Sequence, residues 1–257
     1  MLIDKFARLF KYLKLKLYND LVENQEETEQ LIPPVLDEVK NKLKDIFNQC
    51  DDFRIREVSI EFRFRCQQFD SRKVILAYID GLVNKEMLNR DIMRPLSDLQ
   101  KNILLSDNKK PISHHEDLID FLKENVLNIV EISELNGFQA VINSILSGDS
   151  VLFVEGKRIA LKIESRGWES RGVEEPDTES VVRGPREGFT ETLRTNTSLL
   201  RRKIKNPALK FEHMTLGKQT NTDISICYIK GLIHEDIVKT LKRRLKKIKT
   251  DSILESG

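Results

Sequence analysis

The sequence predicts an α/β fold of the mixed α+β kind, with two subdomains that each hold a small mixed sheet flanked by helices. Three observations carry this prediction. Hydrophobic residues make up 39% and charged residues 33% of the 257 positions, which is the balance of a folded globular chain. Segments with helical spacing of apolar residues alternate with short strand-like runs. A helix–strand–strand–helix order also occurs twice along the chain.

The chain is expected to divide into three parts. Residues 1–34 form a basic arm and linker, in which apolar residues from Leu2 to Leu17 share one helical face and Pro33-Pro34 ends the segment. Such a helix either binds an anionic membrane surface or a partner, or packs on the domain. Residues 35–112 form the first α/β subdomain, and residues 113–257 form the second.

The first subdomain begins with a helix over residues 35–47, whose apolar residues recur at helical spacing. Alternating apolar residues over 55–64 then predict a strand with one buried face. The continuous apolar run over 74–79 predicts a strand that is covered on both faces. A helix is expected to follow over 85–93.

The second subdomain is expected to hold more elements, with Gly156 at the centre of a tight turn between its first two strands. Helices are predicted over 116–122, 136–146, 186–204 and 235–248, and strands over 151–154, 159–163, 209–216 and 224–229. The sequence Tyr-Ile-Asp-Gly-Leu-Val at 78–83 matches Tyr-Ile-Lys-Gly-Leu-Ile at 228–233. Each Gly stands where a strand turns into a helix, so we expect an internal repeat of the four elements.

Composition and motifs exclude several functions. The formal net charge of +2 gives no overall field for holding nucleic acid, so no nucleic-acid partner is expected. The 3 Cys and 4 His do not have zinc-ligand spacing. Motifs that cradle phosphates, such as GxxxxGK[ST] and GxGxxG, are absent. We therefore expect no metal, no cofactor and no catalytic residue.

One pattern keeps an enzyme among the alternatives. Asp149, Glu155 and Lys157 follow the Asp…Glu-x-Lys order of metal-dependent nucleases, in which two carboxylates hold Mg²⁺ and the lysine assists the attacking water. Glu155 and Lys157 flank a predicted turn tip, where the rigid support of a metal site is not expected. A second alternative is a free small-molecule-binding protein with its site between the subdomains.

The segment before the helix at 186–204 is strongly charged. An acidic run over 174–179 precedes Arg183 and Arg186, and Pro185 suits a first helical turn. The two arginines either clamp the acidic run or hold an anion at the helix start. We favour the clamp, because a carboxylate binds arginine bidentately.

This region resembles the signature of the GerA family, the A subunits of bacterial spore germinant receptors. The Tyr-Ile-Lys-Gly-Leu segment at 228–232 also fits that family. The signature positions are candidate contacts for a partner or a ligand, and they are Glu175, Pro176, Asp177, Glu179, Arg183, Gly184, Pro185, Arg186, Glu187, Gly188, Phe189, Asn196, Arg201, Arg202 and Pro207.

The resemblance implies the hydrophilic N-terminal domain of a membrane receptor, on the cytosolic (core) side of the inner spore membrane. It implies nutrient sensing and the signal transduction that starts germination, rather than catalysis. The implied partners are the receptor B and C subunits, the membrane reached through a C-terminal membrane region, and a small nutrient germinant.

The helix near the end of the chain has two predicted faces. Positive residues that flank a membrane helix remain on the cytoplasmic side of the membrane. The basic face is therefore expected beside the membrane, and it consists of Lys242, Arg243, Arg244, Lys246 and Lys247. The apolar stripe is expected to pack on the strand over 224–229, and it consists of Ile237, Leu241, Leu245 and Ile248.

Overall fold

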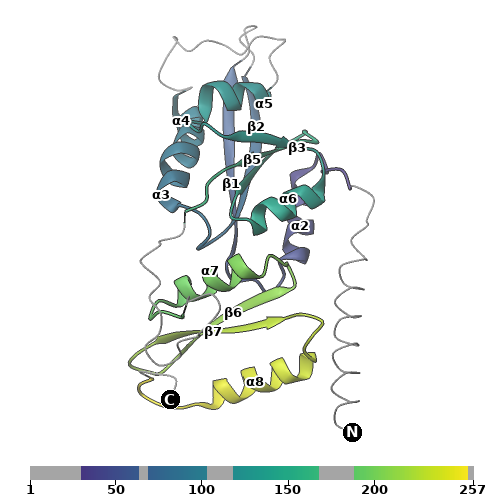
Figure 1. The fold of residues 1–257 in the computed structure, drawn as a ribbon. Helices are drawn as coiled ribbons and strands as arrows, with labels where there is room; N and C mark the ends of the chain where they lie inside the picture. The colour runs from purple at the N-terminus through teal and green to yellow at the C-terminus, as the bar shows by residue number, and fades with distance from the viewer. Residues whose placement is uncertain (1–29, 64–68, 103–117, 168–187, 254–257) are drawn as a thin grey trace, which may run out of the picture.

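The computed structural model describes residues 30–63, 69–102, 118–167 and 188–253 (Figure 1). Its centre is a five-stranded antiparallel sheet with the strand order β1-β2-β4-β5-β3. A separate antiparallel hairpin, β6–β7, lies below this sheet in Figure 1. The strands are β1 (Phe53–Arg63), β2 (Phe69–Ile79), β3 (Ile132–Leu135), β4 (Ser150–Val154), β5 (Ala160–Ile163), β6 (Leu209–Leu216) and β7 (Thr222–Ile229).

Helices cover both faces of the five-stranded sheet, and two more enclose the hairpin (Figure 1). On one face lie α2 (Leu36–Ile46) and α6 (Phe138–Leu146). On the other face lie α3 (Lys85–Met87), the π-helical turn η1 (Leu88–Met93), α4 (Arg94–Asn102), α5 (Leu118–Phe121) and the π-helical turn η2 (Leu122–Val126). The hairpin lies between α7 (Leu193–Lys203) and α8 (Glu235–Lys247).

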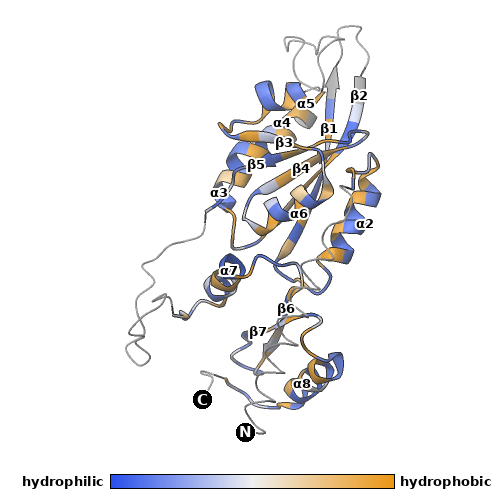
Figure 2. Cartoon of the chain, turned by 45° about the vertical axis from the view of Figure 1, so that its right-hand side comes forward, coloured by the Kyte–Doolittle hydropathy of each residue, from blue (hydrophilic) through white to orange (hydrophobic). Residues whose placement is uncertain are grey.

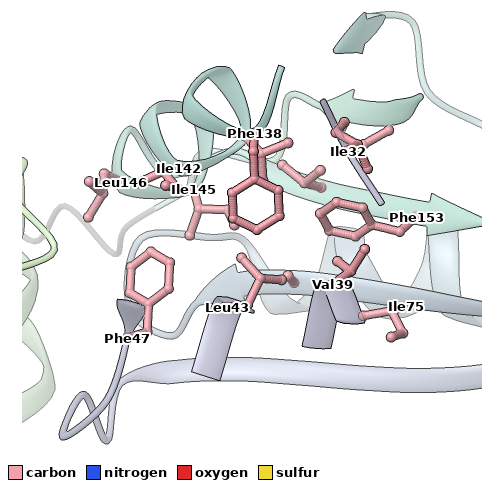
Figure 3. Close-up of a cluster of buried hydrophobic side chains, with 14 of the residues drawn as sticks. Ile32, Val39, Leu43, Phe47, Ile75, Phe138, Ile142, Ile145, Leu146 and Phe153 are labelled. Atoms are coloured by element: carbon pink, nitrogen blue, oxygen red, sulfur yellow. The ribbon is translucent and has the colours of Figure 1, made fainter. Parts of the chain in front are cut away.

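Strand β2 contributes residues to the apolar clusters on both faces of the sheet. All residues over 74–79 are buried, which confirms the prediction of a strand covered on both faces. Because successive side chains of a strand point to opposite faces, Ile75 packs with α2 and α6, whereas Leu76 packs with the helices opposite. Figure 3 shows the first of these clusters, in which Leu43 and Phe138 face each other near Phe153.

The predicted helix over 85–93 continues to Asn102 through η1. Pro95 lacks an N–H, so the carbonyl of Asp91 loses its helical donor. That oxygen instead accepts a hydrogen bond from the backbone N–H of Asn128 at 3.4 Å. The irregular turn thereby ties the helix to the chain that follows η2.

Several boundaries differ from the predictions. The sheets are antiparallel rather than mixed, because most neighbouring strands are joined by short connections, and these favour antiparallel pairs. Strand β3 was not predicted, since its four residues carry too little alternation. The predicted boundary between 112 and 113 lies outside the described residues and stays a prediction; β2 and β4, on either side of it, pair in one sheet.

The two matching junctions are alike locally. Gly81 has φ +98° and Gly231 has φ +90°, and each stands four residues before a helix. The residues before those helices, Asn84 and His234, both cap them through side-chain acceptors. The surroundings differ, because β1 and β2 belong to the larger sheet whereas β6 and β7 pair only with each other. The similarity is therefore one of element order and junction geometry, and an internal repeat is not shown.

Candidate functional site

The signature helix α7 begins later than predicted. Residues 188–192 are not helical, and the helix starts at Leu193 rather than near residue 186. Asn196 explains part of this difference, because its side chain binds the backbone of Thr190 twice: Oδ1 accepts from N at 2.7 Å and Nδ2 donates to O at 2.7 Å. The signature residue Asn196 therefore fixes Thr190 beside α7 and outside the helix.

One face of α7 joins the hairpin to the five-stranded sheet. Arg194, Ser198 and Arg201 are four and three residues apart, so their side chains lie on the same side of the helix. They reach the adjacent ends of β1 and β2, where the backbone N–H of Asp80 donates to the carbonyl of Asp52 at 2.7 Å. We call this contact region the α7 joint.

A buried ion pair forms the centre of the α7 joint. Arg201 Nε lies 2.7 Å and Nη2 lies 3.0 Å from the two oxygens of Asp52, and the two residues are 1% and 5% exposed. Arg201 also donates to the carbonyl of Asn206 at 3.3 Å and stacks over the Phe211 ring. Burial alone would lower the pKa of Arg201, but its bonds to Asp52 outweigh this and raise it, so the arginine stays charged.

A second contact lies at the other end of α7. Arg194 Nη2 is 2.9 Å from Asp80, which also pairs with Lys85 at 3.0 Å. Between the two ion pairs, a Cβ placed on Gly81 would come within 2.3 Å of Ser198 Oγ. Gly81 is thus required both by its positive φ and by the close approach of α7.

Strand β6 adds a third contact. Lys210 Nζ donates to the carbonyl of Ile46 at 3.0 Å, where a cation complements the C-terminal end of α2. Cys50 forms an isolated bridge with Phe211, and its thiol lies 3.8 Å from Lys210 Nζ. Burial lowers the pKa of Lys210 and raises that of Cys50, because the charged form of each group loses hydration in the interior. The α7 joint is therefore packed with buried side chains rather than open to solvent.

The structure describes only part of the signature. Gly188, Arg202 and Pro207 are half-buried, and Phe189 is 70% exposed. The acidic run over 174–179 and the residues Arg183 to Glu187 lie outside the described residues, so the predicted clamp stays a prediction. The carboxylate that the structure pairs with Arg201 is Asp52, which lies outside the signature.

The basic face of α8 differs from the prediction at one position. Arg243, Arg244, Lys246 and Lys247 are exposed, whereas Lys242 is half-buried and bonds Glu212 of β6. The predicted apolar stripe is wrong in most of its members, because Val238 is the buried residue and Leu245 is half-buried. Figure 2 shows hydrophobic and hydrophilic residues alternating around α8. The exposed apolar residues are Ile237, Leu241 and Ile248.

The nuclease hypothesis is contradicted by the geometry. Asp149 and Glu155 stand at opposite ends of β4, about 20 Å apart at the usual rise per residue. Asp149 is 1% exposed and pairs with Arg166 at 2.9 Å, while Glu155 accepts from the N–H of Leu36 at the start of α2. Within the described ranges, no group of three or more His, Cys, Asp or Glu is placed to hold a metal.

The sequence predicted Arg201 and Asn196 as site residues but did not predict the other charged residues of the α7 joint. Asp52, Asp80 and Lys210 lie far from α7 in the sequence or on another element, and nothing in their local pattern sets them apart from solvated charges. The available signal was weak: Asp52 directly precedes β1 and Asp80 directly follows β2, two strands predicted to be neighbours.

The fold and the α7 joint define a domain of two units held together by a buried ion pair, with the amphipathic helix α8 on the outer side. The five-stranded unit consists of the sheet β1 to β5 and the helices on its two faces, and the hairpin unit consists of α7, β6, β7 and α8. Residues 41–257 match the family model described as the Bacillus/Clostridium GerA spore germination protein. The chain belongs to the GerA family.

Relatives and a solved structure agree with this assignment. The chain is 35% identical to spore germination protein KA of Bacillus subtilis (strain 168), and the match covers 91% of this chain and 40% of that protein. It is 31% identical to spore germination protein GerLA of Bacillus cereus, and that match covers 86% of this chain and 41% of the relative. It thus spans about two fifths of these relatives. The N-terminal domain of the A subunit of the Bacillus megaterium germinant receptor GerK3 superposes with a TM-score of 0.61 at 25% identity, covering 86% of this chain and 75% of that one.

A further relative, 35% identical over 95% of this chain and 43% of its own length, is the uncharacterized membrane protein YfkQ of Bacillus subtilis (strain 168). In the part of this chain that the structure describes, no helix is long and apolar enough to span a membrane. By its likeness to the GerK3 domain, the chain corresponds to the N-terminal domain of an A subunit.

Proposed function

We propose that this chain is the N-terminal cytosolic domain of a spore germinant receptor A subunit, and that it takes part in nutrient sensing and in the signal transduction that starts germination. The observation that carries the proposal is the GerA-family match over residues 41–257, supported by the likeness to the GerK3 domain. The domain acts through contacts with partners or a ligand rather than through catalysis.

The proposal extends to the surroundings of the domain. Its partners are the receptor B and C subunits and a small nutrient germinant, and it lies on the core side of the inner spore membrane. The name of the relative YfkQ, a membrane protein, supports a membrane location. The exposed Arg243, Arg244, Lys246 and Lys247 support the assignment of that side of the domain to the membrane.

The α7 joint gives the proposed signal a physical route. A movement of the hairpin unit must either carry the five-stranded unit with it or break the Arg201–Asp52 pair. Buried ion pairs tolerate little displacement, because each charge left alone in the interior is strongly penalised. The joint therefore favours movement of the two units together as one rigid body, so that a displacement of one unit is passed to the other.

A germination assay tests the proposed function. The gene that encodes the chain is deleted from its own organism, and the spores are exposed to a panel of amino acids and sugars. We expect the response to at least one nutrient to be lost and to return with the full gene, but not with a copy that lacks residues 30–253. Responses to the other nutrients serve as the control for spore viability. Unchanged germination with every nutrient that wild-type spores recognise would contradict the proposal.

A further inference from the structure

The outer side of α8 carries an apolar stripe that nothing in the described structure covers. Ile237, Leu241 and Ile248 are 57%, 42% and 47% exposed. Steps of four and seven residues place them in one row along the helix. Leu232, just before the helix, is 49% exposed as well. We call Ile237, Leu241 and Ile248 the α8 stripe.

The hairpin cannot bury this stripe. Two strands spaced about 4.8 Å apart offer a narrow platform, and α8 presents Val238 and Leu245 to it. The bond between Lys242 and Glu212 of β6 fixes this rotation of the helix. The α8 stripe is therefore turned sideways and outward by contacts that the sequence pattern did not reveal.

Positive charge lies beside the stripe. Arg243, Arg244, Lys246 and Lys247 are all exposed in the C-terminal half of α8. At about 100° per residue, Arg244 and Lys247 lie nearest to the α8 stripe, whereas Arg243 and Lys246 lie farther around the helix. The acidic residues of the first turn are partly offset by Lys239, whose Nζ lies 3.7 Å from Asp236. The net field on this side of the helix is thus positive near its end.

We propose that α8 lies flat on an anionic lipid surface, with the α8 stripe inserted between the headgroups and Arg244 and Lys247 bound to lipid phosphates. Arg243 and Lys246 add to the positive field that attracts the surface. A helix that combines exposed aliphatic residues with Lys and Arg matches such a surface in both chemistry and charge. The inference rests on the proposed function for the presence of a membrane. It adds that the helix enters the lipid interface instead of only facing it.

The test measures how the 257-residue chain partitions onto lipid vesicles by co-sedimentation. One set of vesicles contains about a third phosphatidylglycerol and the other only phosphatidylcholine, each at about 0.05 M and about 0.5 M salt. A charge variant replaces Arg243, Arg244, Lys246 and Lys247 with Gln. A stripe variant replaces Ile237, Leu241 and Ile248 with Ser.

Matched controls separate α8 from general effects. A second charge variant replaces four exposed basic residues of the five-stranded unit with Gln, namely Lys44, Arg54, Arg56 and Arg158. The apolar control is Val130→Ser, at a fully exposed position of the same unit. Circular dichroism and the thermal midpoint confirm folding, and Leu241→Ser replaces the stripe variant if the triple change unfolds.

We expect the parent chain to bind anionic vesicles and to bind neutral vesicles little. Part of its binding to anionic vesicles should remain at high salt. The charge variant should lose more than about tenfold in partition at low salt, since each basic residue near such a surface contributes severalfold. The stripe variant should lose the residual binding at high salt. Both controls should bind like the parent chain.

Other results would overturn the proposal. It fails if the parent chain does not bind anionic vesicles at low salt, if either α8 variant binds like the parent, or if the control charge variant loses as much. It also fails if the stripe variant abolishes self-association in sedimentation while vesicle binding is unchanged, because the stripe would then join copies of the chain. The germination assay stays independent, since a receptor that fails to bind vesicles would still show a nutrient response.

Discussion

At the scale of single residues, the α7 joint concentrates its electrostatics in one arginine. Among the residues that the structure describes, Arg201 has the largest fully buried side chain, and Asp52 neutralises it through two hydrogen bonds. A buried pair of this kind adds little net stability compared with apolar residues, but it requires one arrangement of its neighbours. The role of Arg201 is therefore to fix how α7 sits on the sheet.

Arg201→Ala should strongly destabilise the chain, because the carboxylate of Asp52 would remain buried without its partner. We expect a loss of about 3–5 kcal/mol in the free energy of unfolding, measured by urea denaturation. Lys205→Ala, at an exposed position just beyond α7, should change it by less than about 0.5 kcal/mol. A loss for Arg201→Ala as small as that of the control would show that the pair is not buried in solution.

The two matching glycines offer a second comparison. Gly231→Ala should cost about 1–2 kcal/mol, which is the penalty of a left-handed backbone, because nothing lies within 4 Å of the point where the new Cβ would stand. Gly81→Ala should cost more, since its Cβ also meets Ser198 Oγ. Adding Ser198→Ala should bring the cost at Gly81 close to that at Gly231. Thermal denaturation measures all three, and equal costs for the two single variants would contradict the close approach of α7.

At the scale of elements, Glu212 links β6, β7 and α8. Tyr228 of β7 donates its hydroxyl to Glu212 Oε1 at 2.7 Å, and Lys242 of α8 bonds the other oxygen of that carboxylate. Burial and the bond to Glu212 raise the pKa of Tyr228 well above its ordinary value. One carboxylate thereby holds the two strands of the hairpin and α8 together.

This arrangement predicts a loss of stability in alkali. The folded-state pKa of Tyr228 lies above its unfolded value of about 10, so the folded form keeps a proton that the unfolded form releases. The stability linked to that proton is complete below about pH 10 and falls as the pH rises further. Thermal midpoints at about pH 8 and about pH 11 should differ less for Tyr228→Phe than for the parent. An identical alkaline decrease in the variant would assign it to other groups.

At the scale of the whole molecule, the hairpin unit depends on its larger neighbour. A two-stranded hairpin with one helix on each side buries few residues of its own, and in α8 only Val238 is buried. The ion pairs of Arg194 and Arg201 and the contact of Lys210 join it to the five-stranded unit. We therefore expect the two units of the parent chain to unfold together.

Breaking the α7 joint should separate the two unfolding events. In a chain with Arg194→Ala and Arg201→Ala, hydrogen exchange should become faster for amides of β6 and β7, while those of β4 stay protected. The reason is that the five-stranded sheet keeps both of its apolar clusters. Equal loss of protection in β4 and β6 would show that the joint also supports the larger unit.

The sequence predicted the elements with strong local patterns. The helices at 36–46 and 235–247 and the strand at 209–216 fall within a residue or two of the predicted ranges, because periodicity over ten or so residues reports which side of an element is apolar. It failed where the pattern was short or the deciding contact was remote. Strand β3 has four residues, and the start of α7 depends on the bonds between Asn196 and Thr190.

For the candidate site, the signature identified the family and singled out Arg201, yet it said nothing of Asp52. A side chain's partner across 149 residues of sequence is set by how the strands pair, and a charged residue at a strand end has the same local pattern whether it is buried or solvated. The same limit explains the α8 stripe. Its spacing favoured a core face, but the core side of the helix is chosen by Lys242 and the narrow hairpin.

Local sequence was enough to identify the family, the mixed class of the fold, the buried strand at 74–79 and the need for glycine at two strand-to-helix junctions. These features depend on local periodicity, on backbone sterics and on a long signature, and each of these is set by residues that are close together in the sequence. The packing of distant segments, in contrast, brings β1 to β5 into one antiparallel sheet, pairs Arg201 with Asp52, and turns Ile237, Leu241 and Ile248 of α8 outward. Those outcomes depend on which distant surfaces meet, because burial and ion pairing are properties of the packed molecule rather than of any one segment.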